Sequence, residues 1–280
     1  MQRVVVAGAT GSIGRALAAR LRDEGRHVIG ISRTAAGRDD VQVDLTAAPS
    51  SWPAWPPVDV TYICIGAGGL EACERDPAGT RRVHVDAVAK LTHRATLAGS
   101  RVIFLSSSHV FDGTQPVARA LDPRRPQTEY GRQMAEAEIA VLDQPGAAVL
   151  RCSKIIAPGD ARLSKWRTAL LAGRPIEAFD DLYVAPLSLE DAVTALSGIG
   201  DSSKPGIFQL SGPEEATYFS LALALAGDLG VSPSLVTRSS AAAAGMPAAF
   251  RPRGVLLEQS LPQPLQAAPL HDVVARSRRV

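Results

Sequence analysis

Three glycines near the start of the chain have the spacing of a phosphate-binding turn. Gly8, Gly11 and Gly14 follow one another at intervals of three residues, and Thr10, Ser12 and Ile13 lie between them. Residues without a Cβ let the backbone approach a pyrophosphate closely, and the N-terminus of a following helix offers free N–H groups to it. These six residues are therefore expected to bind a dinucleotide, although a tight strand-to-helix turn without a ligand gives the same pattern.

The flanking residues predict the elements that would hold this turn. Val4, Val5 and Val6 precede it as an apolar, β-branched run, which indicates a buried strand. Ile13, Leu17 and Leu21 follow it on one face of an expected helix. A strand, a glycine turn and a helix in this order open an alternating pattern, which favours a parallel α/β sheet that binds a nucleotide at its carboxyl edge.

Two further segments lie where such a sheet would meet its cofactor. The second strand, expected over 27–31, is followed by Arg33 instead of an acidic residue, and Arg38 is a second candidate. An acidic residue at this place binds the ribose hydroxyls of NAD, whereas a guanidinium suits a 2′-phosphate. Arg33 therefore favours NADP, unless it is only a solvated arginine. Gly66 and Ala67 follow the fourth strand, and their small size would let a cofactor cross the sheet edge.

Motifs farther along the chain carry a family resemblance. Residues 106–113 read SSSHVFDG, and Tyr130-Gly131 later opens a helix. Together with the glycine spacing, this resembles the extended branch of the short-chain dehydrogenase/reductase superfamily. It is similar in particular to the dTDP-4-dehydrorhamnose reductase family, whose pattern is Ser-Thr-Asp-Tyr-Val-Phe-Asp-Gly followed by Tyr-Gly. The resemblance implies a Rossmann-type doubly wound parallel sheet with a smaller C-terminal substrate lobe.

The resemblance also implies catalytic roles. Tyr130 would donate a proton to a substrate carbonyl, and the Ser107 hydroxyl would hold the carbonyl oxygen. The family has a lysine four residues after the tyrosine, which holds the ribose and lowers the tyrosine pKa. This chain has Met134 there, which should face the cofactor but brings no charge. Lys154 is either a substitute cation or a lysine of the surface or substrate pocket.

Other positions match less directly. Asp44 and Leu45 match an Asp-apolar pair that lies against the adenine in relatives, but Asp44 could equally cap the next turn. His84 stands where the superfamily has an asparagine that supports a proton relay. It would either continue that relay or pack as a histidine without a catalytic role. Among possible substrate contacts, Ser108 belongs to the catalytic stretch and Arg251 to an Arg-Pro loop near the C-terminus.

Length and composition bound the remaining possibilities. The 280 residues suffice for a Rossmann domain over 1–152 and a mainly substrate-binding lobe over 153–280, with 188–210 expected to return to the first domain. A net charge of +2 gives no case for nucleic acid, and three cysteines form no zinc spacing, so no metal is expected. No apolar run is long enough to span a membrane. A cytoplasmic protein that binds a small-molecule substrate is expected, and a homodimer is compatible with this.

Three functions fit these features. The first is an NADP-dependent reductase of a carbonyl group on a nucleotide sugar or similar small molecule, with an altered catalytic set. The second is an NADP-binding regulatory or sensor subunit that has lost turnover, which the missing lysine and asparagine favour. The third is a lyase or isomerase without redox chemistry that reuses Tyr130 and His84 as acid and base.

Overall fold

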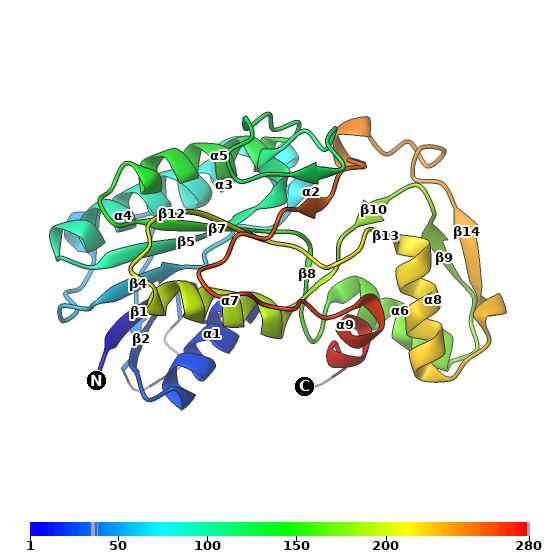
Figure 1. The fold of residues 1–280 in the computed structure, drawn as a ribbon, viewed down its shortest axis with the longest axis horizontal. Coiled ribbons are helices and arrows are strands. Elements are labelled where there is room, and N and C mark those ends of the chain that lie inside the picture. The colour runs from blue at the N-terminus through cyan, green and yellow to red at the C-terminus, as the bar shows by residue number, and fades with distance from the viewer. Residues whose placement is uncertain (35–36, 38, 279–280) are drawn as a thin grey trace.

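A seven-stranded parallel sheet forms the centre of the molecule (Figure 1). The computed structural model describes residues 1–34, 37 and 39–278. The strands lie in the order β12-β7-β5-β4-β1-β2-β3, which is the doubly wound Rossmann arrangement. Their bounds are β1 Arg3–Ala7, β2 His27–Ser32, β3 Val41–Gln42, β4 Val60–Ile63, β5 Arg101–Ser107, β7 Ala148–Cys152 and β12 Gly206–Leu210. The expected fold class is thereby confirmed.

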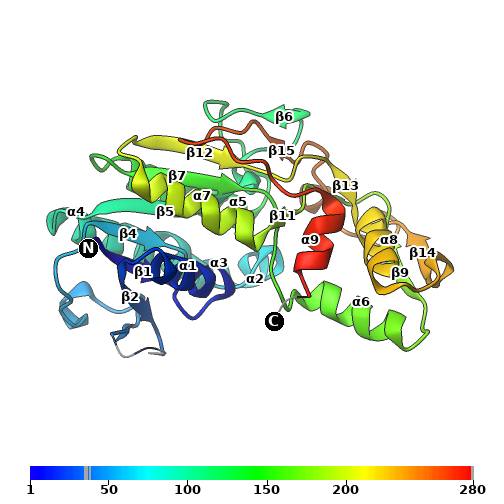
Figure 2. The same ribbon diagram turned by 60° about the horizontal axis from the view of Figure 1, so that its bottom comes forward.

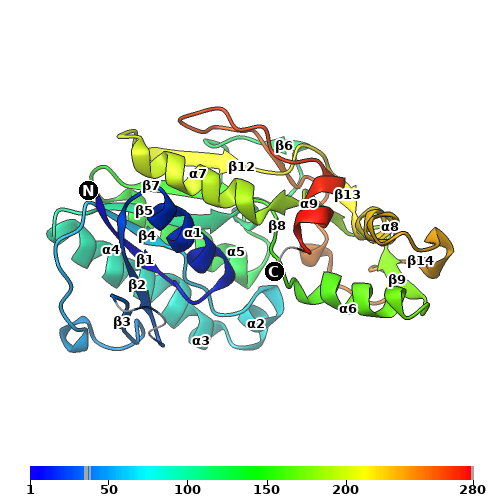
Figure 3. The ribbon, with the colours of Figure 1, turned by 90° about the horizontal axis from the view of Figure 1, so that it is seen from below.

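Helices cover both faces of this sheet, as the three views show (Figures 1, 2 and 3). Alternate residues of β1 point into opposite cores: Val4 and Val6 into one, Val5 and Ala7 into the other. One core is closed by α1 and α7, the other by α4 and α5. Their bounds are α1 Ser12–Asp23, α4 Val88–Leu97, α5 Glu129–Leu142 and α7 Leu189–Asp201.

The expected apolar stripe of α1 faces this core. Leu17 and Leu21 are fully buried against Val193, Leu196 and Ile199 of α7. Burial of a leucine side chain contributes about 1.5–3 kcal/mol, so these residues fix α1 and α7 to one another. The chain leaves the sheet after β7 and returns to it with residues 189–210. These residues thus complete the face of the sheet against which α1 packs.

A smaller lobe lies beyond the carboxyl ends of the strands (Figure 1). Its core contains Leu163, Trp166, Leu221, Leu225 and Val273. It is built from the helices α6 Ala161–Leu171, α8 Tyr218–Leu229 and α9 Leu270–Arg276, and from the parallel pair β9 Ile176–Phe179 and β14 Val236–Ser239. The sequence predicts helices over 163–171 and 218–229, and both are confirmed. Ser188 caps α7 by accepting the Asp191 N–H at 3.0 Å.

Short elements connect the two parts. The pairs are β6 Val117–Ala118 with β15 Leu256–Leu257, β8 Ile155–Ile156 with β11 Leu187–Ser188, and β10 Tyr183–Val184 with β13 Ala216–Thr217. The 3₁₀ turns are η1 Pro49–Ser51, η3 Ser108–Val110, η4 Pro233–Leu235 and η5 Ala248–Phe250. None of the helices in the described part of the chain is long and apolar enough to cross a membrane.

Three elements differ from the sequence-based expectation. The sequence predicts a third strand over 41–45, but the strand ends at Gln42, because Asp44 turns the chain by accepting the Thr46 N–H. It predicts a fifth strand over 101–105, and this strand runs on to Ser107. It predicts one helix over about 78–97, which is divided into α3 Pro77–Arg81, a π-helical segment η2 Arg82–Ala87 and α4. A short helix, α2 Leu70–Arg75, precedes α3.

Candidate active site and cofactor cleft

The glycine turn requires glycine at two of its three positions. Gly8 has a φ of +86°, and a Cβ there would lie 2.5 Å from the Cys64 carbonyl oxygen. A Cβ on Gly14 would lie 2.2 Å from the Gly8 carbonyl oxygen, so this glycine lets α1 pack directly on the turn. Gly11 is exposed and meets only the Gly8 oxygen, at 3.3 Å. Two glycines therefore shape the turn, and the third keeps its outer face open.

The N-terminus of α1 is suited to an anion. Gly11 precedes the helix and has no side chain that could cap it, and the first turn carries no acidic residue. Thr10 and Ser12 are exposed beside it, while Ile13 lines the main cavity. Backbone N–H groups and the helix dipole at such an end attract phosphates. The expected pyrophosphate-binding residues thus have the geometry that this role requires.

A basic side chain, Arg33, directly follows β2. Arg33 is exposed at the end of this strand, and Arg38 lies outside the described residues. Asp44 accepts hydrogen bonds from the Thr46 N–H and hydroxyl at 2.9 and 2.6 Å. These bonds lower the pKa of Asp44, and the charge of Arg33 adds to the effect. Asp44 therefore caps the next turn, which is one of the two roles that the sequence left open for it. Leu45 is buried beside it.

A cavity of about 700 Å³ lies where the two parts of the molecule meet. Ile13 and Gly66 line its end toward the glycine turn. The sheet side contributes Ser107, Tyr130 and Met134, and the smaller lobe contributes Leu182, Tyr183, Val184 and Tyr218. The cofactor edge, the expected catalytic residues and the substrate lobe thus share one continuous space.

Ser107 and Tyr130 form the candidate catalytic pair of this cavity. They come from the end of β5 and the first turn of α5, and both line the cavity. Burial raises the pKa of the Tyr130 phenol, and the Ser107 hydroxyl opposes this only partly. Within the described residues, the other groups that act on this pKa are the Cys73 and Cys152 thiols, which also raise it. The phenol is therefore protonated at neutral pH, and none of the described residues that act on its pKa is a cation.

Met134 occupies the place that the sequence predicted. It lies one helical turn after Tyr130, is 3% exposed and lines the cavity. Its thioether packs in the same apolar core as the Tyr130 ring. Lys154 lines the cavity as well, but its ammonium group pairs with Asp160 at 3.4 Å. The structure thus makes Lys154 a pocket lysine, and its charge is not among the influences on Tyr130.

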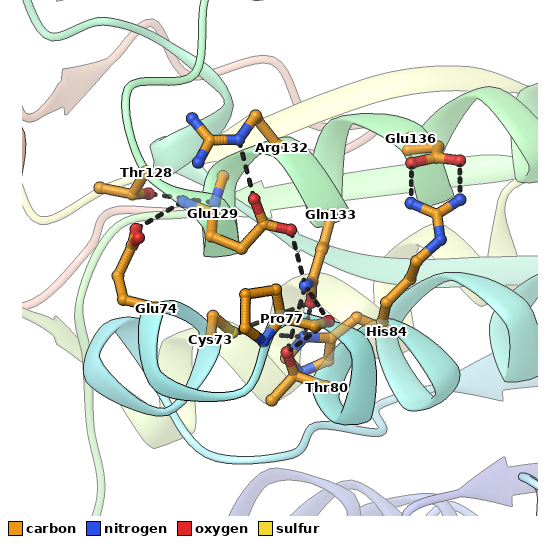
Figure 4. Close-up of polar contacts among 12 residues, drawn as sticks. Cys73, Glu74, Pro77, Thr80, His84, Thr128, Glu129, Arg132, Gln133 and Glu136 are labelled. Atoms are coloured by element: carbon orange, nitrogen blue, oxygen red, sulfur yellow. Dashed lines mark hydrogen bonds and ion pairs between the residues drawn. The ribbon is translucent and has the colours of Figure 1, made fainter.

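His84 joins the cofactor edge to the helix α5, which carries Tyr130. Its Nε2 accepts the Ala67 backbone N–H at 2.9 Å, and its Nδ1 contacts Gln133 Oε1 at 2.9 Å. The Gln133 amide group in turn donates to Glu129, Thr80 and the Pro77 carbonyl (Figure 4). Both ring nitrogens are therefore engaged, with the proton on Nδ1.

This arrangement explains the π-helical segment and the state of His84. Burial lowers the pKa of His84, so the ring is neutral, which the acceptor role of Nε2 requires. An extra residue in a helical turn changes where side chains point, and such segments are frequent at functional sites. The contacts give His84 a positioning role: it holds Ala67 in place beside α5. They leave neither ring nitrogen free for a proton relay.

A buried ion pair fixes the strand and helix that carry Ser107 and Tyr130. The Arg151 guanidinium donates to both Glu138 oxygens, at 2.8 and 2.7 Å, and the two side chains are 1% and 0% exposed. Ser106 donates to Glu138 at 2.6 Å, and Arg151 lies over the Phe111 ring. Since Ser106 precedes Ser107 and Glu138 lies two turns after Tyr130, this cluster sets the distance between the pair.

The substrate contacts expected from the sequence are only partly brought together. Ser108 and Lys154 line the cavity. Arg251 turns instead to the Met246 carbonyl, at 3.1 Å, and toward Asp181, because its own loop must be held in place. The cavity wall there consists of Met246, Phe250, Pro252 and Gly254.

Several residues of the wall were not expected, among them the basic side chains Arg75, His109 and Arg162. Arg162 lies over the Tyr218 ring, 4.7 Å from its centre, at the start of α6. No catalytic or binding motif marks Arg75 or Arg162. His109 could have been noticed, since it departs from the tyrosine in the family pattern and directly follows the serines.

Proteins of two kinds are similar to this chain in sequence. The beta subunit of methionine adenosyltransferase 2 from Bos taurus is 28% identical over 247 residues, which are 80% of this chain and 71% of that protein. The dTDP-4-dehydrorhamnose reductase of Sinorhizobium fredii is 29% identical over 230 residues, 79% of this chain and 76% of that protein.

Solved structures share the fold at low identity. The dTDP-4-dehydrorhamnose reductase of Bacillus anthracis, crystallised with NADP, superimposes with a TM-score of 0.85 at 16% identity, covering 99% of this chain and 98% of that one. The family model described as the RmlD substrate binding domain matches residues 1–269. The chain therefore belongs to the RmlD substrate-binding domain family.

Proposed function

We propose that the protein is an NADP-dependent reductase of a carbonyl group on a nucleotide sugar or a similar small molecule. The observation that supports this most is the Ser107–Tyr130 pair, which lines one cavity together with Ile13 and Gly66 at the cofactor edge. Relatives named dTDP-4-dehydrorhamnose reductase support the substrate class.

Each residue has a defined task in this proposal. Gly8, Gly11 and the first turn of α1 bind the pyrophosphate, and Arg33 binds the 2′-phosphate. When bound, the cofactor supplies the hydride. Ser107 holds the substrate carbonyl oxygen by a hydrogen bond, and Tyr130 delivers its phenolic proton to that oxygen. His84 keeps the Ala67 segment in place at the cofactor edge.

Replacement of Arg33 by serine is expected to weaken NADPH binding about 10- to 100-fold, because it removes hydrogen bonds to a charged phosphate group. NADH binding should stay unchanged, because NADH lacks the 2′-phosphate. Quenching of tryptophan fluorescence gives both dissociation constants, since Trp52 lies against Asp44 near the expected adenine end. Arg20→Ser, on the surface of α1, is the control that should leave both unchanged. Equal binding of NADPH and NADH by the wild-type protein would contradict the NADP assignment.

A second function has a specific observation in its favour. Met134 replaces the lysine that assists the tyrosine in the resembling family, and one group of relatives is named as a subunit of methionine adenosyltransferase. An NADP-binding subunit without turnover of its own would have this combination. A lyase or isomerase on the same site is the third reading, and it would consume substrate without a change in NADPH absorbance.

Met134→Lys separates the first two functions. A cation beside a phenol lowers its pKa by about 1–3 units, so the variant should raise reductase turnover about tenfold or more. Turnover is measured by NADPH absorbance with a panel of nucleotide-sugar ketones. Met134→Leu keeps the burial without the charge and should give no gain. If Met134→Lys binds NADPH normally and still gains nothing, the subunit function is favoured over the reductase.

A further inference from the structure

His109 is an uncommitted imidazole in the wall of the cavity. It lies in η3, directly after the catalytic serines, and its ring packs edge-on against Tyr130 with 5.8 Å between the ring centres. In the part of the chain that the structure describes, no side chain is hydrogen-bonded to its ring nitrogens. His84, which flanks the other edge of Tyr130 at 5.6 Å, has both nitrogens engaged. The two histidines beside the phenol therefore have different tasks.

Lys154 lines the same cavity and acts on His109. Burial and the charge of Lys154 hold the pKa of His109 down at about 4, so the imidazole is neutral at pH 7. The Lys154 side chain is 46% exposed, and its only ion pair among the described residues is with Asp160, at 3.4 Å. A neutral N–H donor and an ammonium group thus face one space beside Tyr130.

The charged side chains that line the cavity are mostly cationic. Of the charged residues that line the cavity, Arg75, Lys154 and Arg162 are cationic and Glu71 is the one carboxylate among the described residues. Burial keeps five other groups of the lining in their neutral form at pH 7: it lowers the pKa of His84 and His109 and raises that of Cys64, Tyr130 and Cys152. Where the family pattern has Asp-Tyr, this chain has Ser108-His109, which removes a carboxylate and adds a donor. The described lining therefore carries more positive than negative side chains.

We propose that His109 and Lys154 form a subsite for an anionic group, a carboxylate in the first instance, which the substrate carries close to its carbonyl. The inference rests on the proposed reductase function and narrows its substrate class to acidic sugars. A carboxylate placed between the two side chains accepts one hydrogen bond from each. It also reverses the influence of Lys154 on the imidazole, because a nearby anion favours the protonated ring. Binding is then accompanied by uptake of a proton by His109.

The test compares two probes that differ only in the acidic group: UDP-glucuronic acid and UDP-glucose. Their affinities for the NADPH-loaded full chain are measured by calorimetry in two buffers of different ionisation heat, which also gives the protons taken up. The wild-type protein should bind UDP-glucuronic acid about tenfold more tightly, with proton uptake at pH 6. Lys154→Met and His109→Gln should each abolish this preference. Lys165→Met, on the exposed face of α6, is the matched control and should keep it.

A second measurement identifies the anion without relying on a nucleotide sugar. The His109 imidazole resonance is titrated with pH in the presence of acetate or inorganic phosphate. A rise of its pKa with acetate supports the carboxylate, and a rise with phosphate alone keeps the subsite and replaces the carboxylate by a phosphate ester.

The outcomes separate the subsite from the proposed function. If both UDP-sugars bind equally tightly and the two variants bind them as the wild type does, the subsite is overturned and the reductase proposal stands. If neither UDP-sugar binds but acetate raises the pKa of His109, the subsite stands and the nucleotide-sugar class fails. If neither acetate nor phosphate changes the resonance, the subsite is overturned as well.

Discussion

Tyr130→Phe is expected to lower the turnover of carbonyl reduction by about 10²- to 10⁴-fold, the usual weight of a positioned acid. The substitution removes one hydroxyl and keeps the ring that packs edge-on against His84 and His109. Folding and cofactor binding should therefore be preserved. Stopped-flow measurement of NADPH oxidation at saturating cofactor and substrate reads the effect on turnover directly.

Tyr62→Phe is the matched control for this prediction. Tyr62 is completely buried, and its hydroxyl accepts a hydrogen bond from Arg26 on the side of the sheet remote from the cavity. Turnover should stay unchanged in this variant. If Tyr130→Phe keeps full turnover while the control behaves as expected, another group delivers the proton, and Tyr130 would have only a packing role.

Glu138→Ala is expected to lower the free energy of unfolding by about 3–5 kcal/mol, the cost of leaving one charge of a buried pair without its partner. The Arg151 guanidinium would keep only its hydrogen bond to the Ala120 carbonyl in a site that is almost closed to water. Ser106 would lose its acceptor at the same time. Urea unfolding followed by circular dichroism measures the change.

A control and a double variant make this result specific. Glu136→Ala, on the same helix, breaks a surface pair with Arg81 and should cost less than about 1 kcal/mol. Glu138→Leu combined with Arg151→Met removes both charges and should be less destabilised than Glu138→Ala alone. Equal destabilisation by Glu138→Ala and Glu136→Ala would show that the buried pair is not the source of the effect.

Local patterns predicted the parts of the molecule that depend on near neighbours. The glycine turn follows from Gly8 and Gly14, whose missing Cβ atoms are needed whatever surrounds them. Met134 could be placed opposite the cofactor edge because an α-helix brings residues four apart onto one face. The alternation of apolar runs and helices favoured a parallel α/β sheet, and the family resemblance implied its Rossmann arrangement, which the strand order confirms.

Contacts between segments that are distant in the sequence determine the features that the sequence patterns did not predict. The network of His84 depends on Gln133, 49 residues later, and on a π-helical turn that no local pattern announces. Arg162 and Arg251 carry the same charge, yet only Arg162 faces the cavity, because Asp181 and the Met246 carbonyl hold Arg251 elsewhere. For long polar side chains, the partner nearby determines the direction, and sequence position alone does not.

The return of residues 189–210 to the sheet has a consequence for biosynthesis. Residues 1–152 emerge from the ribosome without α7 and β12, so the apolar face of Leu17 and Leu21 and the edge of β7 stay uncovered. Only when residue 210 has left the exit tunnel can both be closed. The nucleotide-binding half is thus completed late, and its apolar surface stays open to non-native contacts while the intervening part of the smaller lobe is made.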